Sequence, residues 1–449
     1  MRDTTDVHAI LHALRSAATS PTRQARSAVV LGRLLGLAFV VCLLTGLYSH
    51  FLQEPAAWMR FPTRPVWLYQ VTQGVHITAG IAAIPLLLGK LHAVFPQLFQ
   101  SLPTRPVQVL ERASIAVFVA ASILQLVTGL LNTYQWYPWP FPFKQVHWAL
   151  SFVIVGSLVI HIGVKLPLIA RYWRRRDSYD ADGRFVPPGG DLDPDGARFD
   201  AERELRRRRA VGTAAPLASE ARGLVGRVQR WIDRDPAAPP AVDEAEAARR
   251  ERLSRRGFFT AVGVATGGVV VLTGGQSFTP LQPFNAFAPR QRGLGPSDLP
   301  INRTAAAAKV LESAMDPSWQ LTVVHGERRL SLTADDLTAM TQRAASLPIS
   351  CVEGWSQTGH WRGVRLADLV ALVGAPAGAG LRITSLEERG GYRVTEMGGE
   401  YVADPLTLVA LELNGERLTI DHGYPARIIA PGRPGVLQTK WLSTLEVLR

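Results

Sequence analysis

The stretch Leu347-Pro-Ile-Ser-Cys351-Val-Glu-Gly-Trp-Ser-Gln-Thr-Gly-His-Trp-Arg-Gly363 places a single cysteine in a segment rich in glycine and tryptophan. The chain has two cysteines, and the other, Cys42, lies in an apolar run typical of a membrane helix. Cys351 therefore has no expected disulfide partner in its own domain. A lone thiol of this kind is a nucleophile, a metal ligand or a small buried side chain without a chemical role.

The composition indicates a membrane protein with more than one domain. A length of 449 residues allows two or three folding units, and apolar residues make up 47% of the chain. The net charge is +12, but twenty arginines, sixteen acidic residues and no lysine fall within residues 171–256. Arginine enrichment directly after an apolar helix is typical of a cytoplasmic loop. No aromatic interleaving or phosphate-binding glycine loop accompanies it, so we do not expect nucleic-acid binding.

Five apolar runs are each close to the roughly 20 residues that span a bilayer. They are about Val29–Tyr48, Leu68–Leu88, Ala113–Leu131, Trp148–Leu168 and Phe258–Gly275. Arginines in the N-terminal segment, residues 1–27, place it inside, so alternation places loops 49–67 and 132–146 outside and loop 89–112 inside. We therefore expect an all-α bundle of four helices in residues 28–170, a largely disordered cytoplasmic linker over 171–256 and a fifth helix over 257–276.

Histidines in the apolar runs are candidate iron ligands, because a histidine within hydrocarbon is costly and usually functional. His147 and His161 are fourteen residues apart. On an ideal helix they lie about 40° apart around the axis and about 21 Å apart along it, so one helix offers ligands at two depths. By topology, His76 can face His147 and His92 can face His161. His92 and His50 can also be interfacial histidines, and Cys42, Gln73, Gln125 and Thr128 are interpreted as helix-packing residues.

This arrangement of histidines resembles the bacterial four-helix di-haem b-type cytochromes, which pass electrons between quinol and a partner. The resemblance covers about residues 28–170. It implies one or two haems b, with His76, His147 and His161 matching ligand positions of that family. The family's remaining ligand lies in the inner half of the first helix, where residues 29–41 contain no histidine. His92 is therefore the candidate for the fourth ligand.

Before the fifth apolar run stands Ser254-Arg255-Arg256-Gly257-Phe258-Phe259, which resembles the twin-arginine export motif. An arginine pair can also simply anchor a helix on the inside face. Twin-arginine export carries folded proteins, which suits a domain that acquires a complex cofactor in the cytoplasm. Ala286-Phe-Ala288 has the form of a peptidase site, but cleavage there would separate the two halves of the protein, so we expect none.

Residues 290–449 predict a single α+β, strand-rich domain. Short β-type runs recur at Trp319–Val324, Leu381–Ser385, Arg417–Ile420, Ala426–Ile429 and Leu445–Leu448. Asn414-Gly415 predicts a tight turn. Brief helices are expected at Thr333–Met340, with Thr333 as cap and Asp336 at the third helical position, and at Leu366–Val373.

A second motif is Asn414-Gly-Glu-Arg-Leu-Thr-Ile-Asp-His422-Gly-Tyr-Pro-Ala-Arg427-Ile-Ile-Ala-Pro-Gly432-Arg-Pro-Gly435-Val-Leu-Gln-Thr-Lys440-Trp441. Together with the Cys351 motif, it closely resembles the sulfite-oxidase superfamily of molybdopterin enzymes over about residues 298–449. Cys-Val-Glu-Gly-Trp-Ser is most similar to the periplasmic methionine-sulfoxide-reductase branch, whereas His422 is typical of the oxidase branch.

The resemblance assigns roles that suit the residue types. A molybdenum held by a dithiolene favours a further soft thiolate, for which Cys351 is the candidate ligand and catalytic residue. Arginine and lysine suit a phosphorylated pterin, and glycines 423, 432 and 435 would let the backbone approach the ligand closely. The resemblance implies pterin contacts from Asn302, Ser385, His422, Arg427, Gln438, Thr439 and Lys440. His360 and His325 lack such support, although His360 follows Cys351 by only nine residues.

These features predict a multi-pass protein of the cell (inner) membrane, embedded in lipid, with an extracytoplasmic Mo-molybdopterin domain exported by the twin-arginine machinery. Electrons from quinol would pass through haem b to molybdenum, which would reduce an S-oxide or N-oxide by oxygen-atom transfer. Two alternatives stay open. A sulfite-type substrate could be oxidised with electrons entering the quinone pool, or the chain could be a non-catalytic, haem-anchored binding or sensing module.

Overall fold

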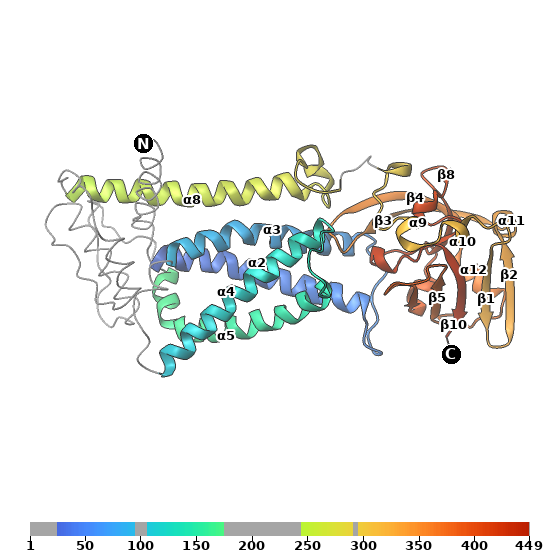
Figure 1. The fold of residues 1–449 in the computed structure, drawn as a ribbon, viewed down its shortest axis with the longest axis horizontal. Helices are drawn as coiled ribbons and strands as arrows, with labels where there is room; N and C mark the ends of the chain where they lie inside the picture. The colour runs from blue at the N-terminus through green and yellow to red at the C-terminus, as the bar shows by residue number, and fades with distance from the viewer. Residues whose placement is uncertain (1–24, 95–105, 175–243, 291–294, 449) are drawn as a thin grey trace, which may run out of the picture. The chain divides into compact units, whose positions relative to one another are not determined.

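The computed structural model describes residues 25–94, 106–174, 244–290 and 295–448 (Figure 1). Within these ranges, five helices are long and apolar enough to cross a membrane, as expected from the sequence. These helices are α2 (Ala25–Gln53), α3 (Leu68–Val94), α4 (Pro106–Thr133), α5 (Phe143–Arg174) and α8 (Glu244–Gly274). Large apolar side chains on them, such as Leu37, Leu44 and Val159, are exposed, which is the arrangement that lipid contact favours.

Contacts divide the chain into two compact units. Unit 1 takes residues 1–40, 80–130 and 137–269. Unit 2 takes residues 41–79, 131–136 and 270–449. Unit 2 therefore contains the C-terminal part of α2, the segment that leads into α3 and the first turns of α3, in addition to the strand-rich C-terminal domain.

The core of unit 1 joins α8 to α2 and α3. Leu31 and Leu35 of α2 pack with alanines and leucines of α3, and Phe258, Phe259 and Val262 of α8 pack against the same cluster. A Cβ atom added at Gly89 of α3 would lie 3.0 Å from a methyl carbon of Val262, so glycine permits the close approach of these helices. The fifth helix is thus part of the helix packing of unit 1.

The linker expected over residues 171–256 is helical at both of its described ends. Helix α5 continues to Arg174, and α8 begins at Glu244, so α8 crosses the boundary expected at residue 257. Alanine, glutamate and arginine dominate residues 244–256 and are strong helix formers, which explains the extension. The disorder expected for residues 175–243, and residues 1–24 of the N-terminal segment, lie outside the described residues.

The C-terminal domain in unit 2 is built on two five-stranded sheets, with short helices between the strands (Figure 1). The first sheet has the order β2-β1-β10-β5-β6, in which β1 and β10 are parallel and the other pairs antiparallel. Its strands are β1 (Gln320–His325), β2 (Arg328–Thr333), β5 (Leu381–Ser385), β6 (Val394–Met397) and β10 (Leu442–Val447).

The second sheet has the order β3-β4-β7-β8, with β9 paired to β7, and is antiparallel. Its strands are β3 (Gln342–Ser350), β4 (Ser356–Arg365), β7 (Leu408–Leu413), β8 (Glu416–Arg417) and β9 (Arg427–Ile429). The helices are α9 (Ala305–Ala308), α10 (Leu311–Met315), α11 (Ala334–Ala339), α12 (Leu366–Ala371) and α13 (Gly399–Ala403). Short 3-10 helices are η2 (Thr279–Phe284), η3 (Pro296–Asp298), η4 (Ile420–His422) and η5 (Gly435–Leu437).

The α+β class and the helical half are confirmed, and most elements expected in the C-terminal domain occur within about three residues of their predicted bounds. Helix α11 has the full reciprocal cap, in which Thr333 Oγ1 accepts from the Asp336 amide and Asp336 accepts from the Thr333 amide. The strand expected at Arg417–Ile420 is wrong beyond Arg417. The chain turns into η4 there, because the Ile420 carbonyl accepts from Trp441 Nε1 at 2.7 Å.

Candidate active site

Cys351 lies at the turn between β3 and β4, the hairpin formed by the glycine- and tryptophan-rich stretch. Its amide donates to the Trp355 carbonyl at 2.8 Å, and its carbonyl accepts from the Gly354 amide at 3.0 Å. Gly354 has a φ of +104°, a backbone conformation that favours glycine. Residues 351–356, here called the Cys351 loop, therefore form a tight turn that fixes the cysteine; its residue is only 1% exposed.

The Cys351 thiol is surrounded by groups that oppose its ionisation. Burial and then the Glu353 carboxylate raise the pKa of the thiol well above its usual range. Burial also raises the pKa of Glu353, whose Oε1 accepts a hydrogen bond from the side-chain amide of Gln135. A neutral thiol is a poor nucleophile and a poor ligand, so a thiolate at this position requires a strongly polarising cation such as a bound metal.

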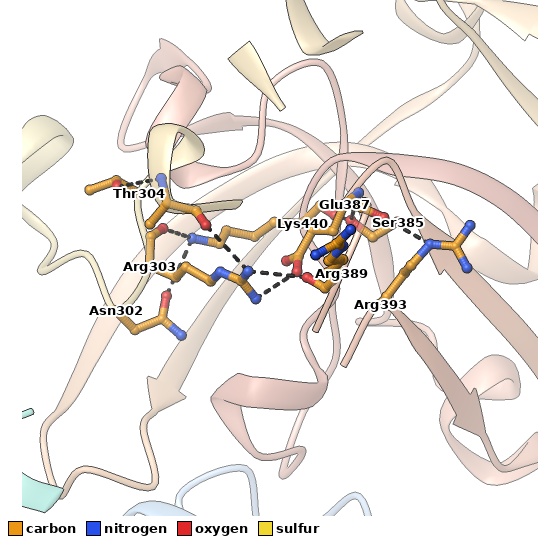
Figure 2. Close-up of polar contacts among 9 residues, drawn as sticks. Asn302, Arg303, Thr304, Ser385, Glu387, Arg389, Arg393 and Lys440 are labelled. Carbon is orange, nitrogen blue, oxygen red and sulfur yellow. Dashed lines mark hydrogen bonds and ion pairs between the residues drawn. The ribbon is translucent and has the colours of Figure 1, made fainter. Parts of the chain in front are cut away.

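Two cations of the second motif are candidates for pterin contacts; Arg427 is buried and Lys440 is partly buried. Lys440 Nζ donates to the Arg303 carbonyl at 2.6 Å and to Asn302 Oδ1 at 3.3 Å (Figure 2). It also donates to the Asp421 carbonyl at 3.0 Å. The Arg427 guanidinium donates to the carbonyls of His422, at 2.9 Å, and Gln438, at 3.2 Å. Burial lowers the pKa of Lys440 to about 7 and that of Arg427 to about 9.

Figure 2 shows how the Lys440 environment is held together. Arg303 forms an ion pair of 2.7 Å with Glu387 and donates to the Arg389 carbonyl at 3.2 Å. Ser385 donates to the Lys440 carbonyl at 2.8 Å, and Arg393 Nε donates to the Glu387 carbonyl at 2.8 Å. The loop after β5 and the segment before α9 thus meet around Lys440.

The structure therefore brings pterin residues predicted from the sequence into two groups, each of which is held together by hydrogen bonds. Asn302, Ser385 and Lys440 share one hydrogen-bond network, and His422, Arg427 and Gln438 share the other. His422 Nε2 donates to the Pro296 carbonyl at 2.8 Å, and burial lowers its pKa to about 4. Gln438 pairs with the main chain of Ala430 at 2.7 and 2.8 Å, and Thr439 lies 2.9 Å from Thr395 Oγ1.

Gln135, from the segment after α4, connects the first of these groups with the Cys351 loop. Its amide nitrogen donates both to Glu353 and to the Asn302 carbonyl, the latter at 3.0 Å, and its Oε1 accepts from Arg290. All of these residues belong to unit 2. The Cys351 loop, through Glu353, and the pterin-contact candidate Asn302 thus accept hydrogen bonds from the same amide side chain.

Three glycines and two histidines singled out in the sequence have the following surroundings. The glycines at 423, 432 and 435 approach the protein's own chain: a Cβ added at Gly435 would lie 2.9 Å from the Ser350 carbonyl oxygen, and one at Gly423 would lie 3.1 Å from Lys440 Cβ. Glycine at 423 and 435 thus permits close loop packing, and an approach of these backbones to a ligand stays a prediction. His360 is exposed and lies 2.7 Å from Ser346 Oγ, and His325 lies 3.3 Å from the Val373 carbonyl. These two histidines are held by contacts outside the Cys351 loop.

The donor set fits an anionic pterin bound next to a thiolate-held metal. Within the described residues, Lys440 and Arg427 donate to neutral carbonyl and amide oxygens and form no ion pair. Burial is costly for a positive charge and lowers the pKa of both groups; the acids Glu387 and Asp421 lie near Lys440, whereas no acid acts on Arg427. A phosphate group would supply an opposite charge to Arg427 and accept charge-assisted hydrogen bonds.

The helix histidines are held in ways that suit axial ligation. His76 Nδ1 lies 3.0 Å from the Cys42 carbonyl, and since a carbonyl only accepts, Nδ1 carries the proton and Nε2 can coordinate iron. His147 Nδ1 lies 3.4 Å from Thr128 Oγ1. Cβ atoms added at Gly46 and Gly129 would lie 3.1 and 3.3 Å from the rings of His76 and His147, so a glycine faces each imidazole.

The two histidines expected nearer the inside differ from each other. His161 stacks on Phe118, with ring centroids 6.1 Å apart, and its Nδ1 is buried without a hydrogen-bond partner in the described part of unit 1. No described residue therefore fixes the tautomer of His161, in contrast to His76. His92 packs against Phe258 of α8 at 5.4 Å between ring centroids. The donor sets of His76, His147 and His161 fit haem iron, while His92 is at least partly an aromatic packing residue.

Sequence reasoning missed Gln135, Arg290 and Glu353, and it interpreted Gln73, Cys42 and Thr128 only as packing residues. Glu353 stands inside the quoted motif and Gln135 inside the aromatic segment after α4, so each had a local signal. Gln73 donates to the Val352 carbonyl at 3.0 Å, a contact across 279 positions that no local pattern indicates.

Two family models match the chain. Residues 308–449 match "oxidoreductase molybdopterin binding domain", and residues 24–176 match "prokaryotic cytochrome b561". The two models imply Mo-molybdopterin and haem b as cofactors, in agreement with the donor sets described above.

Individual relatives match part of the chain. Sulfite oxidase of Arabidopsis thaliana is 30% identical over 37% of this chain and 52% of its own length. The uncharacterized oxidoreductase YuiH of Bacillus subtilis (strain 168) is 31% identical over 28% of this chain and 64% of its own length. The sulfane dehydrogenase SoxCD of Paracoccus pantotrophus, a solved structure, is 24% identical over 29% of this chain and 38% of that chain, with a TM-score of 0.27. The chain thus spans between about half and two thirds of these two curated relatives.

Proposed function

We propose that this chain, in which a cytochrome b561 domain precedes a sulfite-oxidase-like molybdopterin-binding oxidoreductase domain, is a membrane-bound reductase of S-oxides or N-oxides. Quinol would supply the electrons, which would pass through haem b to molybdenum. The observation that carries the proposal is the presence, in one unit of the fold, of the haem-ligand candidate His76 and the molybdenum-ligand candidate Cys351. A chain with both needs no separate electron carrier.

When bound, the molybdenum cofactor supplies two-electron oxygen-atom transfer and the haem supplies one-electron transfer. The residues of this chain would hold and tune these groups. Cys351 would be the protein ligand to the metal and would lose its proton on binding, since its thiol is neutral otherwise. Lys440 and Arg427 would meet the anionic part of the pterin, and His76, His147 and His161 would hold haem iron.

The net reaction would consume two electrons and two protons for each S-oxide, and it would release the sulfide and water. In the folded protein the Cys351 loop is closed against Gln135 and Arg290, which limits solvent around the metal-binding sulfur. Limited solvent access strengthens the electrostatic influence of Lys440 and Arg427 on bound anions.

Two measurements on the detergent-solubilised full chain test the proposal. Metal and haem quantitation should give molybdenum together with one or two haems b. Reduced-dye oxidation should depend on methionine sulfoxide, and Cys351→Ser should abolish it while the haem absorbance persists. Purified protein that contains haem but no molybdenum would instead support a binding or sensing module.

A second candidate is oxidation of a sulfite-type substrate with electrons delivered to the quinone pool. Two observations favour it. His422 matches the oxidase branch, and the relative from Arabidopsis thaliana, 52% of whose length is matched, is named sulfite oxidase. Ferricyanide reduction that depends on sulfite, without dye oxidation by methionine sulfoxide, would establish this direction of electron flow.

The location of the catalytic domain is part of the proposal. We place the domain on the extracytoplasmic side of the inner membrane, delivered by twin-arginine export through Arg255 and Arg256. The support is chemical: a domain that binds a molybdenum cofactor folds around it where the cofactor is made, and the twin-arginine route carries folded domains. Residues 286–288 fold back on α8, since the Phe287 amide donates to the Leu272 carbonyl at 2.9 Å, which supports an uncleaved anchor.

A further inference from the structure

The Cys351 loop packs on the first turns of helix α3. Gln73, which is 4% exposed, donates from Nε2 to the Val352 carbonyl at 3.0 Å. One turn later, Ile77 packs against Gly354. Gln73 and Ile77 are four residues apart, so they lie on the same side of the helix. These residues all belong to unit 2, so the loop and this part of α3 form one body.

Gly354 makes this contact as close as a backbone allows. A Cβ atom added there would lie 2.7 Å from Ile77 Cγ1, closer than carbon atoms pack. The positive φ of Gly354 turns its backbone toward α3, and Ser277 Oγ donates to the Gly354 carbonyl from the other side. The sequence thus uses glycine at this position both for the turn and for the approach to the helix.

His76 lies between the two contact residues in the sequence of α3. It follows Gln73 by three residues, which places these two side chains about 60° apart around the helix, and it directly precedes Ile77. Its Nδ1 is fixed by the Cys42 carbonyl at 3.0 Å. One hydrogen bond, to Val352, and one van der Waals contact, to Gly354, therefore join this turn of the haem-ligand helix to the peptide that directly follows Cys351.

We propose that Gln73 and Ile77 are positioning residues that couple the His76 turn electronically to the Cys351 loop, so that electrons pass directly between the two sites within one chain. This inference rests on the proposed function and adds to it a route. A reduced haem would give up one electron at a time, and two such electrons with two protons would convert the S-oxide into sulfide and water. Electron tunnelling weakens steeply with gaps between atoms, so a hydrogen bond and a tight packing contact are what a short route requires.

The alternative reading of the same contacts is that they only fasten the domain to the helix. The chain offers a matched control for this reading. Gln70, one turn earlier on α3, donates from Nε2 to the Ser277 carbonyl at 3.3 Å. It is the same residue type and fastens the same helix, but its partner belongs to the segment after α8 and not to the Cys351 loop.

The experiment compares Gln73→Met with Gln70→Met in the full-length holoenzyme. Methionine keeps the side-chain length and removes the donor. Haem is first reduced with a limiting amount of dithionite, the protein is then mixed with methionine sulfoxide, and haem reoxidation is followed by stopped-flow absorbance. We expect Gln73→Met to slow reoxidation roughly tenfold, which is about 1.4 kcal/mol in activation free energy, and Gln70→Met to stay near wild type.

Two further readouts separate coupling from fastening. The haem spectrum and the dye-driven turnover, in which a small reductant reaches the metal directly, should be unchanged in Gln73→Met. Equal slowing by both variants, or wild-type reoxidation in Gln73→Met, would overturn the inference. If Gln73→Met does not fold, Ile77→Ala, which loosens the Gly354 contact without removing a polar group, gives the same comparison.

Failure of this inference can be told apart from failure of the proposed function. Wild-type protein that shows no dye-driven turnover with methionine sulfoxide would contradict the proposed function. Wild-type protein with dye-driven turnover and substrate-dependent haem reoxidation, in which Gln73→Met reoxidises its haem at the wild-type rate, would contradict only the route through Gln73 and Ile77.

Discussion

At Cys351 the fold opposes the chemistry that a free cysteine would perform. The thiol is buried and lies beside the Glu353 carboxylate, and both effects disfavour the thiolate. A nucleophilic cysteine needs the opposite, an exposed site with positive neighbours. Of the three roles that the sequence leaves open for a lone thiol, these surroundings disfavour a nucleophile. A metal ligand, in which the metal would replace the proton, stays the prediction, and a small buried side chain packed with Leu347, Ile349 and Trp355 stays its alternative.

The first prediction concerns the reactivity of this thiol without metal. In cofactor-free full-length protein, Cys351 should react with iodoacetamide at pH 8 at least about tenfold more slowly than in the denatured chain, since burial and Glu353 keep it protonated. Peptide mass spectrometry measures the labelling and distinguishes Cys351 from Cys42. Labelling at the denatured rate would show that the thiol is open and ionised.

A second prediction concerns Lys440, whose pKa burial lowers to about 7. The neighbouring cations Arg427 and Arg303 and the neighbouring acids Glu387 and Asp421 act on the same group. The unfolded chain holds the Lys440 proton up to a pKa near 10.4, so between pH 7 and that value the unfolded state binds more protons than the folded state. Stability should therefore rise with pH above 7, by at most about 1.4 kcal/mol per pH unit.

Thermal melting of cofactor-free protein at pH 7.0 and pH 8.5 checks this expectation. The wild-type melting temperature should rise between these two values, and Lys440→Met should lose most of the rise. The window ends at pH 8.5 because the unfolded Cys351 thiol begins to ionise there and acts in the opposite direction. A variant that keeps the full rise would assign the pH effect to another group.

At the scale of the elements, the sequence predicts what is local. The apolar runs predict the five long helices, and the Thr333–Asp336 pattern predicts the cap of α11. The hairpin of β3 and β4 was missed, because proline and glycine interrupt its alternation even though the exposed and buried residues of β4 do alternate. The motifs predict Cys351, Arg427 and Lys440 as site candidates.

Residues that complete the site come from distant parts of the chain, and the sequence could not place them. Gln135 contacts Glu353 across 218 positions, and Arg290 contacts Gln135 across 155. Such contacts depend on how a membrane-helix loop and a strand-rich domain fold together, and no periodicity or turn signal encodes that. A motif identifies the chemistry at its own positions, whereas the surrounding contacts depend on the tertiary structure.

The third prediction separates the two roles of Gly354. Gly354→Ala should lower stability by about 1–2 kcal/mol for the positive φ and by a further amount for the clash with Ile77. Gly378→Ala is the matched control, because Gly378 has a φ of +78° and nothing within 4 Å of an added Cβ. The double variant Gly354→Ala with Ile77→Ala should regain part of the lost melting temperature. If the melting temperature of the double variant equals that of Gly354→Ala, the clash with Ile77 does not contribute to the lost stability.

At the scale of the whole molecule, one long helix combines a packing surface with two arginine pairs. Helix α8 packs through Phe258, Phe259 and Val262 in the core of unit 1, and its N-terminal half carries the arginine pair that resembles an export signal. Both arginine pairs of this helix, Arg249-Arg250 and Arg255-Arg256, can anchor it by charge on the inside. Only the second pair is followed by Gly-Phe-Phe. An anchor needs only positive charge at this pair, whereas an export signal needs arginine itself.

The fourth prediction uses this difference. Changing Arg255 and Arg256 to lysine keeps both charges, so a helix that is only anchored by charge should insert and export as before. If the twin-arginine machinery reads the guanidinium groups, the catalytic domain of this variant should stay inside, protected when protease is added to spheroplasts, while the wild-type domain is digested. Lysine at Arg249 and Arg250 is the control and should leave export intact. An unexported domain can still acquire its cofactor, so the retained protein should keep dye-driven turnover in a lysate. This second readout separates an export defect from misfolding. Export of the Arg255/Arg256 variant at the wild-type level would leave charge anchoring as the role of the pair.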